Sequence, residues 1–327
     1  MDSIPSVSTS YSPTRAHAVR GYFYIATATF LWGIAAALGR AAFTGRLFGG
    51  QVHTIDPLIL SQCRTTFSLW VLLPVLASGR GWRRLQLPGR DVAYLFVLGI
   101  LGVAASNYFY YLAIQRTTVA TAIILQYTAP VWVLIYMVVR GLQKATPSRV
   151  AAVLLAVTGC AVVIGVIGPG KLRLDTIGVV AAVAAAFSFA FYNVGGHNIL
   201  ARYDRWIVLL WTLVAASAFW LLVNPPWKIM AAHYSGVEWA FLFVFSLISV
   251  LGPFSLYFAG LQHLEPTRAI VVSCLEPVFS IVIAAITLGE VMRPLQSLGI
   301  VIVLAAIVLV QMPDRRTHEA VIVEPIE

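Results

Sequence analysis

The residues 273–280, SCLEPVFS, place Glu276 and Pro277 in the middle of an otherwise apolar stretch. A charge at the centre of a bilayer costs about 2.5 to 3.5 kcal/mol on insertion scales, so this carboxyl group should face the interior of a helix bundle or a water-filled cavity. There it could carry a proton or bind a cationic group. The other interpretation is a neutral, hydrogen-bonded packing residue beside a helix kink, and the sequence leaves both open. Ser273 and Ser280 share the helical face of Glu276.

Two prolines interrupt apolar stretches at equivalent places. Because proline has no N–H group, Pro277 removes the helical partner of the Ser273 carbonyl, and Pro130 removes that of the Gln126 carbonyl. Unpaired carbonyls are costly in lipid, so they should face a cavity or be met by another side chain. Pro130 and Pro277 are therefore predicted to be helix kinks at the border of a cavity.

Aromatic and amide side chains elsewhere in the apolar stretches would suit an uncharged or zwitterionic solute. The predicted substrate-binding residues are Trp32, Asn107, Tyr111, Gln126, Tyr192, Asn193, Tyr257, Ser273 and Glu276. Aromatic residues in membrane spans also serve as packing or interfacial anchors, and amides can pair between helices, so these roles remain alternatives. Arg40 and Arg64 could meet a carboxylate of the solute, but long basic side chains near span ends usually reach the interface, and the sequence favours that role for both.

The elements that must position these side chains follow from composition. Of the 327 residues, 60% are hydrophobic and 11% are charged, against about 25% charged in soluble domains, which predicts an all-α polytopic membrane protein. Apolar stretches of about 20 residues are long enough to cross a bilayer as helices. Ten such stretches are expected at 21–44, 57–78, 92–114, 117–139, 149–168, 177–200, 206–223, 237–262, 266–288 and 294–312.

The net charge of +9 comes from basic residues in the short connections between these stretches. Most of them lie on one side if the N-terminus is cytoplasmic, so the positive-inside rule predicts that both termini face the cytoplasm. Residues 1–20 and 313–327 are then cytoplasmic tails. This distribution favours a lipid bilayer as the partner of the basic residues and gives no reason to expect nucleic acid.

The two halves of the chain repeat each other. A shift of 147 residues places Pro130 on Pro277 and Tyr110 on Tyr257. We therefore predict two five-helix units, 21–168 and 177–312. Because five is odd, the second unit enters the membrane from the opposite side, and inverted repeats of this kind are typical of secondary transporters.

Several motifs then point to a family. The sequences FLWG at 30–33, QCRTTF around Arg64, TAPVW at 128–132 and LEPVFSIVIAAITLGE at 275–290 resemble the two tandem EamA-type repeats of the drug/metabolite transporter superfamily. The resemblance implies ten helices in inverted five-helix repeats and export or exchange of small metabolites, often amino acids. The first repeat departs from the pattern with Gln143 where the second has Glu290.

The predicted function is secondary transport by alternating access, exporting a small metabolite such as an amino acid or related zwitterion across a bacterial inner membrane. The alternatives are an exporter of drug-like cations or nucleotide-linked sugars, and a membrane protein without transport activity. An enzyme is not expected, because the spans lack paired carboxylates and the chain lacks HExxH and GxxxxGK[ST] motifs. No metal or other cofactor is expected, since the three cysteines have no CxxC spacing. Both a monomer and a homodimer remain open.

Overall fold

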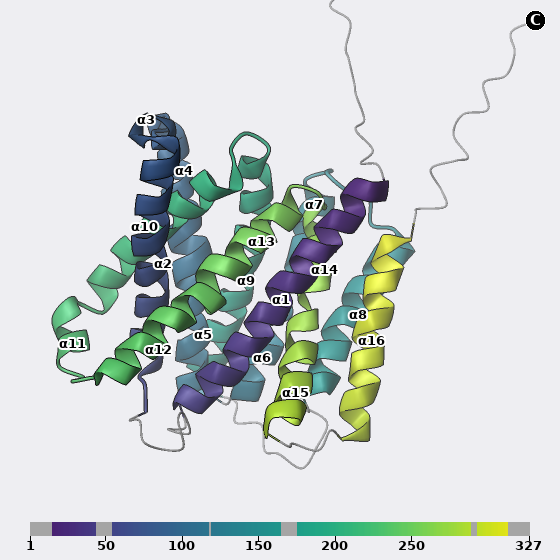
Figure 1. Cartoon of the computed structure of the whole chain (residues 1–327). Coiled ribbons are helices and arrows are strands. Elements are labelled where there is room, and N and C mark those ends of the chain that lie inside the picture. Colours follow the sequence, from purple (N-terminus) through teal and green to yellow (C-terminus); the bar gives the residue numbers. More distant parts are fainter. Residues whose placement is uncertain (1–14, 44–53, 118, 165–174, 289–292, 313–327) are drawn as a thin grey trace, which may run out of the picture.

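The computed structural model describes residues 15–43, 54–117, 119–164, 175–288 and 293–312, and within these ranges it consists of helices and their connections (Figure 1). In chain order the elements are α1 (Arg15–Phe43), α2 (Pro57–Arg80), α3 (Trp82–Leu85), α4 (Gly89–Val97), η2 (Leu98–Ala104), α5 (Ala105–Arg116), α6 (Val119–Gln126), α7 (Ala129–Val139), α8 (Pro147–Ile164), α9 (Thr176–Leu200), α10 (Arg205–Val223), α11 (Pro226–Met230), α12 (Gly236–Ser246), η3 (Leu247–Leu251), α13 (Gly252–Leu261), α14 (Pro266–Ser273), α15 (Leu275–Leu288) and α16 (Pro294–Gln311).

Ten helical stretches in the described residues are long and apolar enough to cross a membrane, which confirms the predicted number. Four of them are composite: α4, η2 and α5 form the third, α6 and α7 the fourth, α12, η3 and α13 the eighth, and α14 and α15 the ninth. α1 starts earlier than the predicted residue 21. The helix begins at Arg15, and its apolar stretch begins at Ala18. Arginine and alanine are good helix formers, so the helix continues beyond its apolar part. Residues 1–14 and 313–327 of the predicted tails lie outside the described ranges.

Acidic residues at the helix ends have a local structural role. The carboxylate of Asp56 accepts hydrogen bonds from the backbone N–H groups of Leu58 and Ile59 at the start of α2. Asp175 and Asp204 cap α9 and α10 in the same way. Such caps satisfy N–H groups that have no partner within the helix. These carboxylates therefore stabilise the starts of helices and lie outside the bundle interior.

The third and eighth spans each contain a π-helical segment, η2 and η3. A π segment holds an additional residue in a helical turn, and such segments are frequent at functional sites. The sequence predicted continuous helices at 92–114 and 237–262, so this feature was missed. Proline lies just beyond η3, at Pro253, whereas no proline follows η2 before the end of α5.

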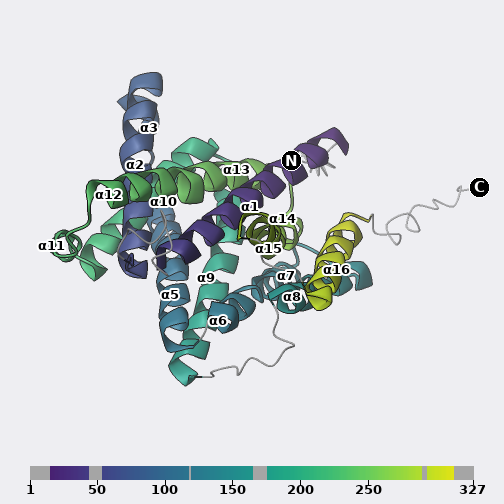
Figure 2. The same ribbon diagram turned by 60° about the horizontal axis from the view of Figure 1, so that its bottom comes forward.

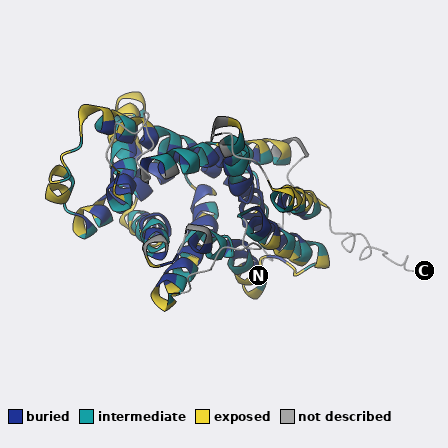
Figure 3. Ribbon diagram, turned by 90° about the horizontal axis from the view of Figure 1, so that it is seen from below, coloured by how far each residue is buried: buried dark blue, intermediate teal, exposed yellow. Residues whose placement is uncertain are grey.

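The helices pack as pairs around a central region (Figures 1 and 2). α16 lies along α8, α5 lies along α9, and α1 packs between α13 and α15. α1 starts and α16 ends at the same end of the bundle, the top of Figure 1, which we call the terminal end. Seen from the other end, buried residues concentrate where the helices face one another, and exposed residues lie on the outer surfaces (Figure 3). Many of the exposed residues are large and apolar, as expected for lipid-facing helices.

Candidate functional site

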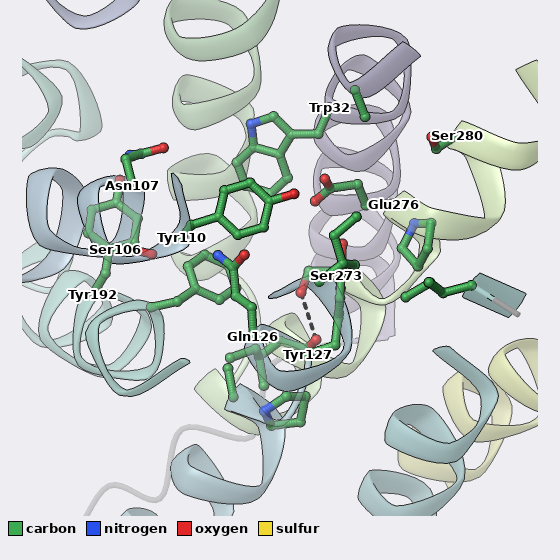
Figure 4. Close-up of a pocket in the computed structure, with 18 of the residues that line it drawn as sticks. Trp32, Ser106, Asn107, Tyr110, Gln126, Tyr127, Tyr192, Ser273, Glu276 and Ser280 are labelled. Atoms are coloured by element: carbon green, nitrogen blue, oxygen red, sulfur yellow. Dashed lines mark hydrogen bonds between the residues drawn. The ribbon is translucent and has the colours of Figure 1, made fainter. Parts of the chain in front are cut away.

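A cavity of about 290 Å³ lies between the helices of the two halves (Figure 4). Its wall contains residues from α1, α2, the third, fourth and ninth spans, α8, α9, α13 and α16. The polar and aromatic residues of this wall are Trp32, Arg64, Ser106, Asn107, Tyr110, Tyr111, Gln126, Tyr127, Phe189, Tyr192, Phe254, Ser273, Glu276, Ser280 and Gln296.

The cavity extends towards one end of the bundle. Ile164 at the end of α8, Ala285 near the end of α15 and Gln296 near the start of α16 all line it. These three positions lie at the end opposite the terminal end, the bottom of Figure 1. The cavity therefore reaches from the middle of the bundle towards that side.

The two halves pack directly against each other at the terminal end. A side-chain carbon added at Gly21 of α1 would come within 2.7 Å of Leu264, so α1 lies directly on the connection between α13 and α14. The rings of Tyr24 and His263 stack there at 6.1 Å between centroids. Nearby, the side-chain amide of Gln143 donates to Glu265 at 3.1 Å and accepts from the Thr267 hydroxyl at 2.8 Å. Polar and apolar contacts thus join the two halves at this end.

The cavity brings together seven of the nine predicted substrate-binding residues: Trp32, Asn107, Tyr111, Gln126, Tyr192, Ser273 and Glu276. The other two, Asn193 and Tyr257, are outside its wall. Both are fully buried, and the Asn193 amide donates a hydrogen bond to the Tyr257 hydroxyl. They point into the contact between α9 and α13, where a polar side chain needs a partner from the facing helix. Tyr257 supports the cavity from behind, because its ring packs on Trp32 at 5.4 Å.

The two proline positions coincide with breaks in the helices. α6 ends at Gln126 and α7 begins at Ala129, with Pro130 in its first turn. α14 ends at Ser273 and α15 begins at Leu275, so Pro277 lies in the first turn of α15. The residues whose carbonyls lose a helical partner, Gln126 and Ser273, both line the cavity. The breaks therefore lie at the cavity wall rather than in contact with lipid.

Glu276 lines the cavity from the first turn of α15 (Figure 4). The positive end of the helix dipole lies there and favours a nearby carboxylate. Its carboxyl group lies near the side chain of Tyr127, which belongs to the break in the fourth span. This contact adds to the packing of α7 against α14 and brings the breaks of the fourth and ninth spans together. The cavity and this partner together explain how an acidic residue is accommodated in an apolar stretch.

Arg64 lines the cavity from α2, opposite in charge to Glu276. Its guanidinium Nη2 donates to the side-chain oxygen of Asn107, and its charge interacts with Glu276 through space. The sequence favoured an interfacial position for Arg64, which is wrong. α2 carries this residue on a face that packs inside the bundle, so the side chain points to the cavity instead. The Arg40 side chain lies outside the described residues.

The sequence did not predict several other residues of the cavity wall. Tyr110 lies three residues after Asn107 and so shares its helical face, and Tyr127 follows Gln126 in the helix break. Ser106 and Gln296 also line the cavity. Helical spacing from the predicted residues would have found Tyr110. Nothing in the sequence pattern points to Gln296, which lies at the start of α16 near a connection.

A solved crystal structure shares this fold at 20% identity, with a TM-score of 0.73 over 93% of this chain and 99% of that chain. Named relatives are transporters. The inner membrane transporter YicL of Salmonella typhimurium is 23% identical over 71% of this chain and 77% of its own length. The threonine/homoserine exporter RhtA of Escherichia coli K12 is 27% identical over 72% of this chain and 76% of its own length.

The model of the EamA-like transporter family matches the chain twice, at residues 19–165 and 176–312. Each match contains five of the ten candidate spans in the described residues. Together they extend over most of the chain, and the breaks and the cavity lie within them. The chain is therefore a member of the EamA-like transporter family, an integral membrane protein built for transport.

Proposed function

We propose that this protein exports a small zwitterionic metabolite, an amino acid or a close relative, across the cytoplasmic membrane by alternating access. The observation that carries this proposal is that one central cavity holds both Arg64 and Glu276. A guanidinium group and a carboxyl group in the same cavity complement a solute that has both a carboxylate and an ammonium group. The volume of about 290 Å³ is at the lower end of the range for ligand pockets, which suits a small solute.

The shape of the cavity supports alternating access. It reaches towards the end of the bundle opposite the termini, while contacts between the halves close the terminal end. We propose that units 21–168 and 177–312 are inverted copies that rock against each other, so that these contacts break when the cavity opens to the other side. In this proposal the described state is open to one side of the membrane.

The proposed orientation places both termini in the cytoplasm. Arg80, Arg83, Arg84 and Arg90 lie at or between the end of α2 and the start of α4, at the terminal end. Basic residues are enriched on cytoplasmic connections. The described cavity would then face outwards, and residues 1–20 and 313–327 would be cytoplasmic. The name of YicL supports an inner membrane location.

The similarity to RhtA supports the substrate class, because that relative is named as an exporter of threonine and homoserine. Both of these solutes are small zwitterions with a hydroxyl group. The hydroxyl and amide side chains of the cavity, such as Ser273 and Gln126, are suited to solutes of this kind. Threonine is therefore the first probe for transport.

The test is counterflow in proteoliposomes that contain the purified protein. Vesicles loaded with unlabelled threonine should accumulate labelled threonine transiently, whereas vesicles loaded with buffer or lacking protein should not. The variant Ser78→Ala should show the same counterflow as the native protein, because Ser78 lies near the exposed end of α2 and outside the cavity wall. Absence of counterflow for every amino acid tested, with sugars or organic cations exchanged instead, would contradict the proposal.

A further inference from the structure

We infer that Arg64 is the residue that binds the carboxylate of the solute, and that Asn107 is the positioning residue that aims it. This inference rests on the proposed function, because it assigns one end of a zwitterionic substrate to one part of the cavity. It also changes the role expected for Asn107 from direct solute binding to support of the guanidinium group.

The side-chain amide of Asn107 has two hydrogen-bond partners. Its Nδ2 donates a hydrogen bond of 2.7 Å to the backbone oxygen of Val103, in the π segment η2. Its Oδ1 accepts a hydrogen bond from Arg64. Both ends of the amide are therefore engaged by the protein. The two bonds together fix the orientation of the amide. A flipped amide would present its N–H groups to a guanidinium group that can only donate, and its oxygen to a carbonyl oxygen that can only accept.

The guanidinium group of Arg64 has donors left over. Arginine carries five N–H donors and no acceptor, and the bond to Asn107 uses one of them. The Nε atom is buried without a hydrogen-bond partner in the described structure. Since Arg64 lines the cavity, an acceptor brought into the cavity can reach its guanidinium group. A carboxylate has two coplanar oxygens that match the guanidinium fork and bind it in bidentate fashion.

Glu276 does not fill this role within the protein. Its carboxyl group lies near Tyr127, and among the described contacts it acts on Arg64 only through space. The two groups come from different spans, α2 and α15. A zwitterion can therefore lie between them with its carboxylate at Arg64 and its ammonium group towards Glu276. The aromatic rings of Trp32 and Tyr110 border the same space and can contact the apolar part of the solute.

The inference predicts selection for a free carboxylate. Amino acids should bind, whereas amides and decarboxylated amines of the same shape should bind poorly, because the donors of Arg64 would then lack a charged acceptor. A site built around such polar groups binds analogues without the matching group at least about tenfold more weakly.

The experiment measures competition against counterflow of labelled threonine by threonine, threoninamide and 1-aminopropan-2-ol. For the native protein we expect threonine to compete at least about tenfold better than the two analogues, which lack the carboxylate. The measured quantity is the ratio of the concentrations of analogue and of threonine that halve the counterflow. Arg64→Gln should reduce this ratio towards one, and Arg64→Lys should retain part of it because the charge remains. The ratio compares solutes on the same protein, so it does not depend on how much active protein is reconstituted.

Asn107 is tested in the same assay. Asn107→Leu keeps a similar volume but removes both hydrogen bonds, and it should raise the KM for threonine about tenfold with a smaller change in maximal rate and should reduce the ratio. Asn107→Asp should reduce it too, because a carboxylate at 107 would pair with Arg64 and compete with the solute. A purely structural asparagine would lower the rates for all solutes equally and leave the ratio unchanged.

The outcomes separate this inference from the proposed function. If the native protein exchanges no amino acid, the proposed function is wrong. If it exchanges threonine and Arg64→Gln keeps the native ratio, the function stands and the assignment of Arg64 is overturned. If Arg64→Gln loses the ratio but Asn107→Leu and Asn107→Asp both keep it, the positioning role of Asn107 is overturned. Should Arg64→Gln fail to fold, Arg64→Lys and the Asn107 variants decide the question.

Discussion

The indole nitrogen of Trp32 donates a hydrogen bond of 3.2 Å to the backbone oxygen of Ser249. That oxygen would bond to the N–H of residue 253 in a regular α-helix, but Pro253 has none. Trp32 therefore supplies a donor to an acceptor whose regular α-helical partner is missing, and this acceptor lies within the π segment η3. Its ring also lines the cavity and packs on Phe254 at 5.3 Å. The cavity wall and the irregular part of the eighth span are thus joined by one side chain.

The first prediction concerns this bond. Trp32→Phe keeps an aromatic ring but removes the indole donor from the buried Ser249 oxygen, so it should destabilise the protein by about 1 to 3 kcal/mol. Thermal unfolding in detergent should show a lower Tm. Trp70→Phe is the matched control, because Trp70 is 63% exposed on α2. Equal Tm values for the two variants would contradict the role assigned to Trp32.

The second prediction concerns Glu276. Glu276→Gln keeps the shape of the side chain but cannot gain or lose a proton, so we expect slower threonine counterflow with a flatter dependence on pH between pH 5 and pH 8. Asp175→Asn is the control, since it also turns a carboxylate into an amide but lies at the start of α9, where asparagine caps equally well. Native rate and native pH dependence in Glu276→Gln would exclude a role in proton coupling.

The third prediction concerns the closed terminal end. Gln143→Leu removes the hydrogen bonds to Glu265 and Thr267 and should favour the state that opens at that end. In a background without the three native cysteines, a cysteine at Ser273 should then react faster with a polar thiol reagent added to the cytoplasmic side. Leu142→Ala is the control, because Leu142 is exposed on the same connection. Unchanged or slower labelling in Gln143→Leu would argue against a gate at this place.

The fourth prediction concerns helix packing. A side-chain carbon at Gly299 would lie 2.6 Å from the backbone nitrogen of Val163, so α8 and α16 would have to move apart. Gly299→Ala should therefore destabilise the protein by about 1 to 3 kcal/mol. Gly79→Ala should have the opposite sign, because open space surrounds Gly79 in α2 and alanine favours the helix by roughly 0.5 to 1 kcal/mol. The Tm of each variant in detergent measures both effects, and a Gly299→Ala protein as stable as the native one would contradict the close approach.

The sequence by itself determined the membrane-spanning helices and the sites of their breaks. Span length and apolar composition are set by the thickness of the bilayer, so local residue counts suffice to find them. The missing N–H of Pro130 and Pro277 is likewise a local property. The cost of a charge in lipid is general enough to place Glu276 inside the bundle without knowledge of its neighbours.

Only the tertiary structure decided which side chains reach the cavity. Asn193 and Tyr257 satisfy each other between two helices, whereas Arg64 and Tyr127 line the cavity. In a soluble helix the apolar face marks the interior, but in a membrane the lipid and the packed interior are both apolar, so the sequence carries little information about helix rotation. Rotation and partner choice follow from contacts between helices far apart in the chain, and for that reason only the folded structure shows that Asn107 meets Arg64.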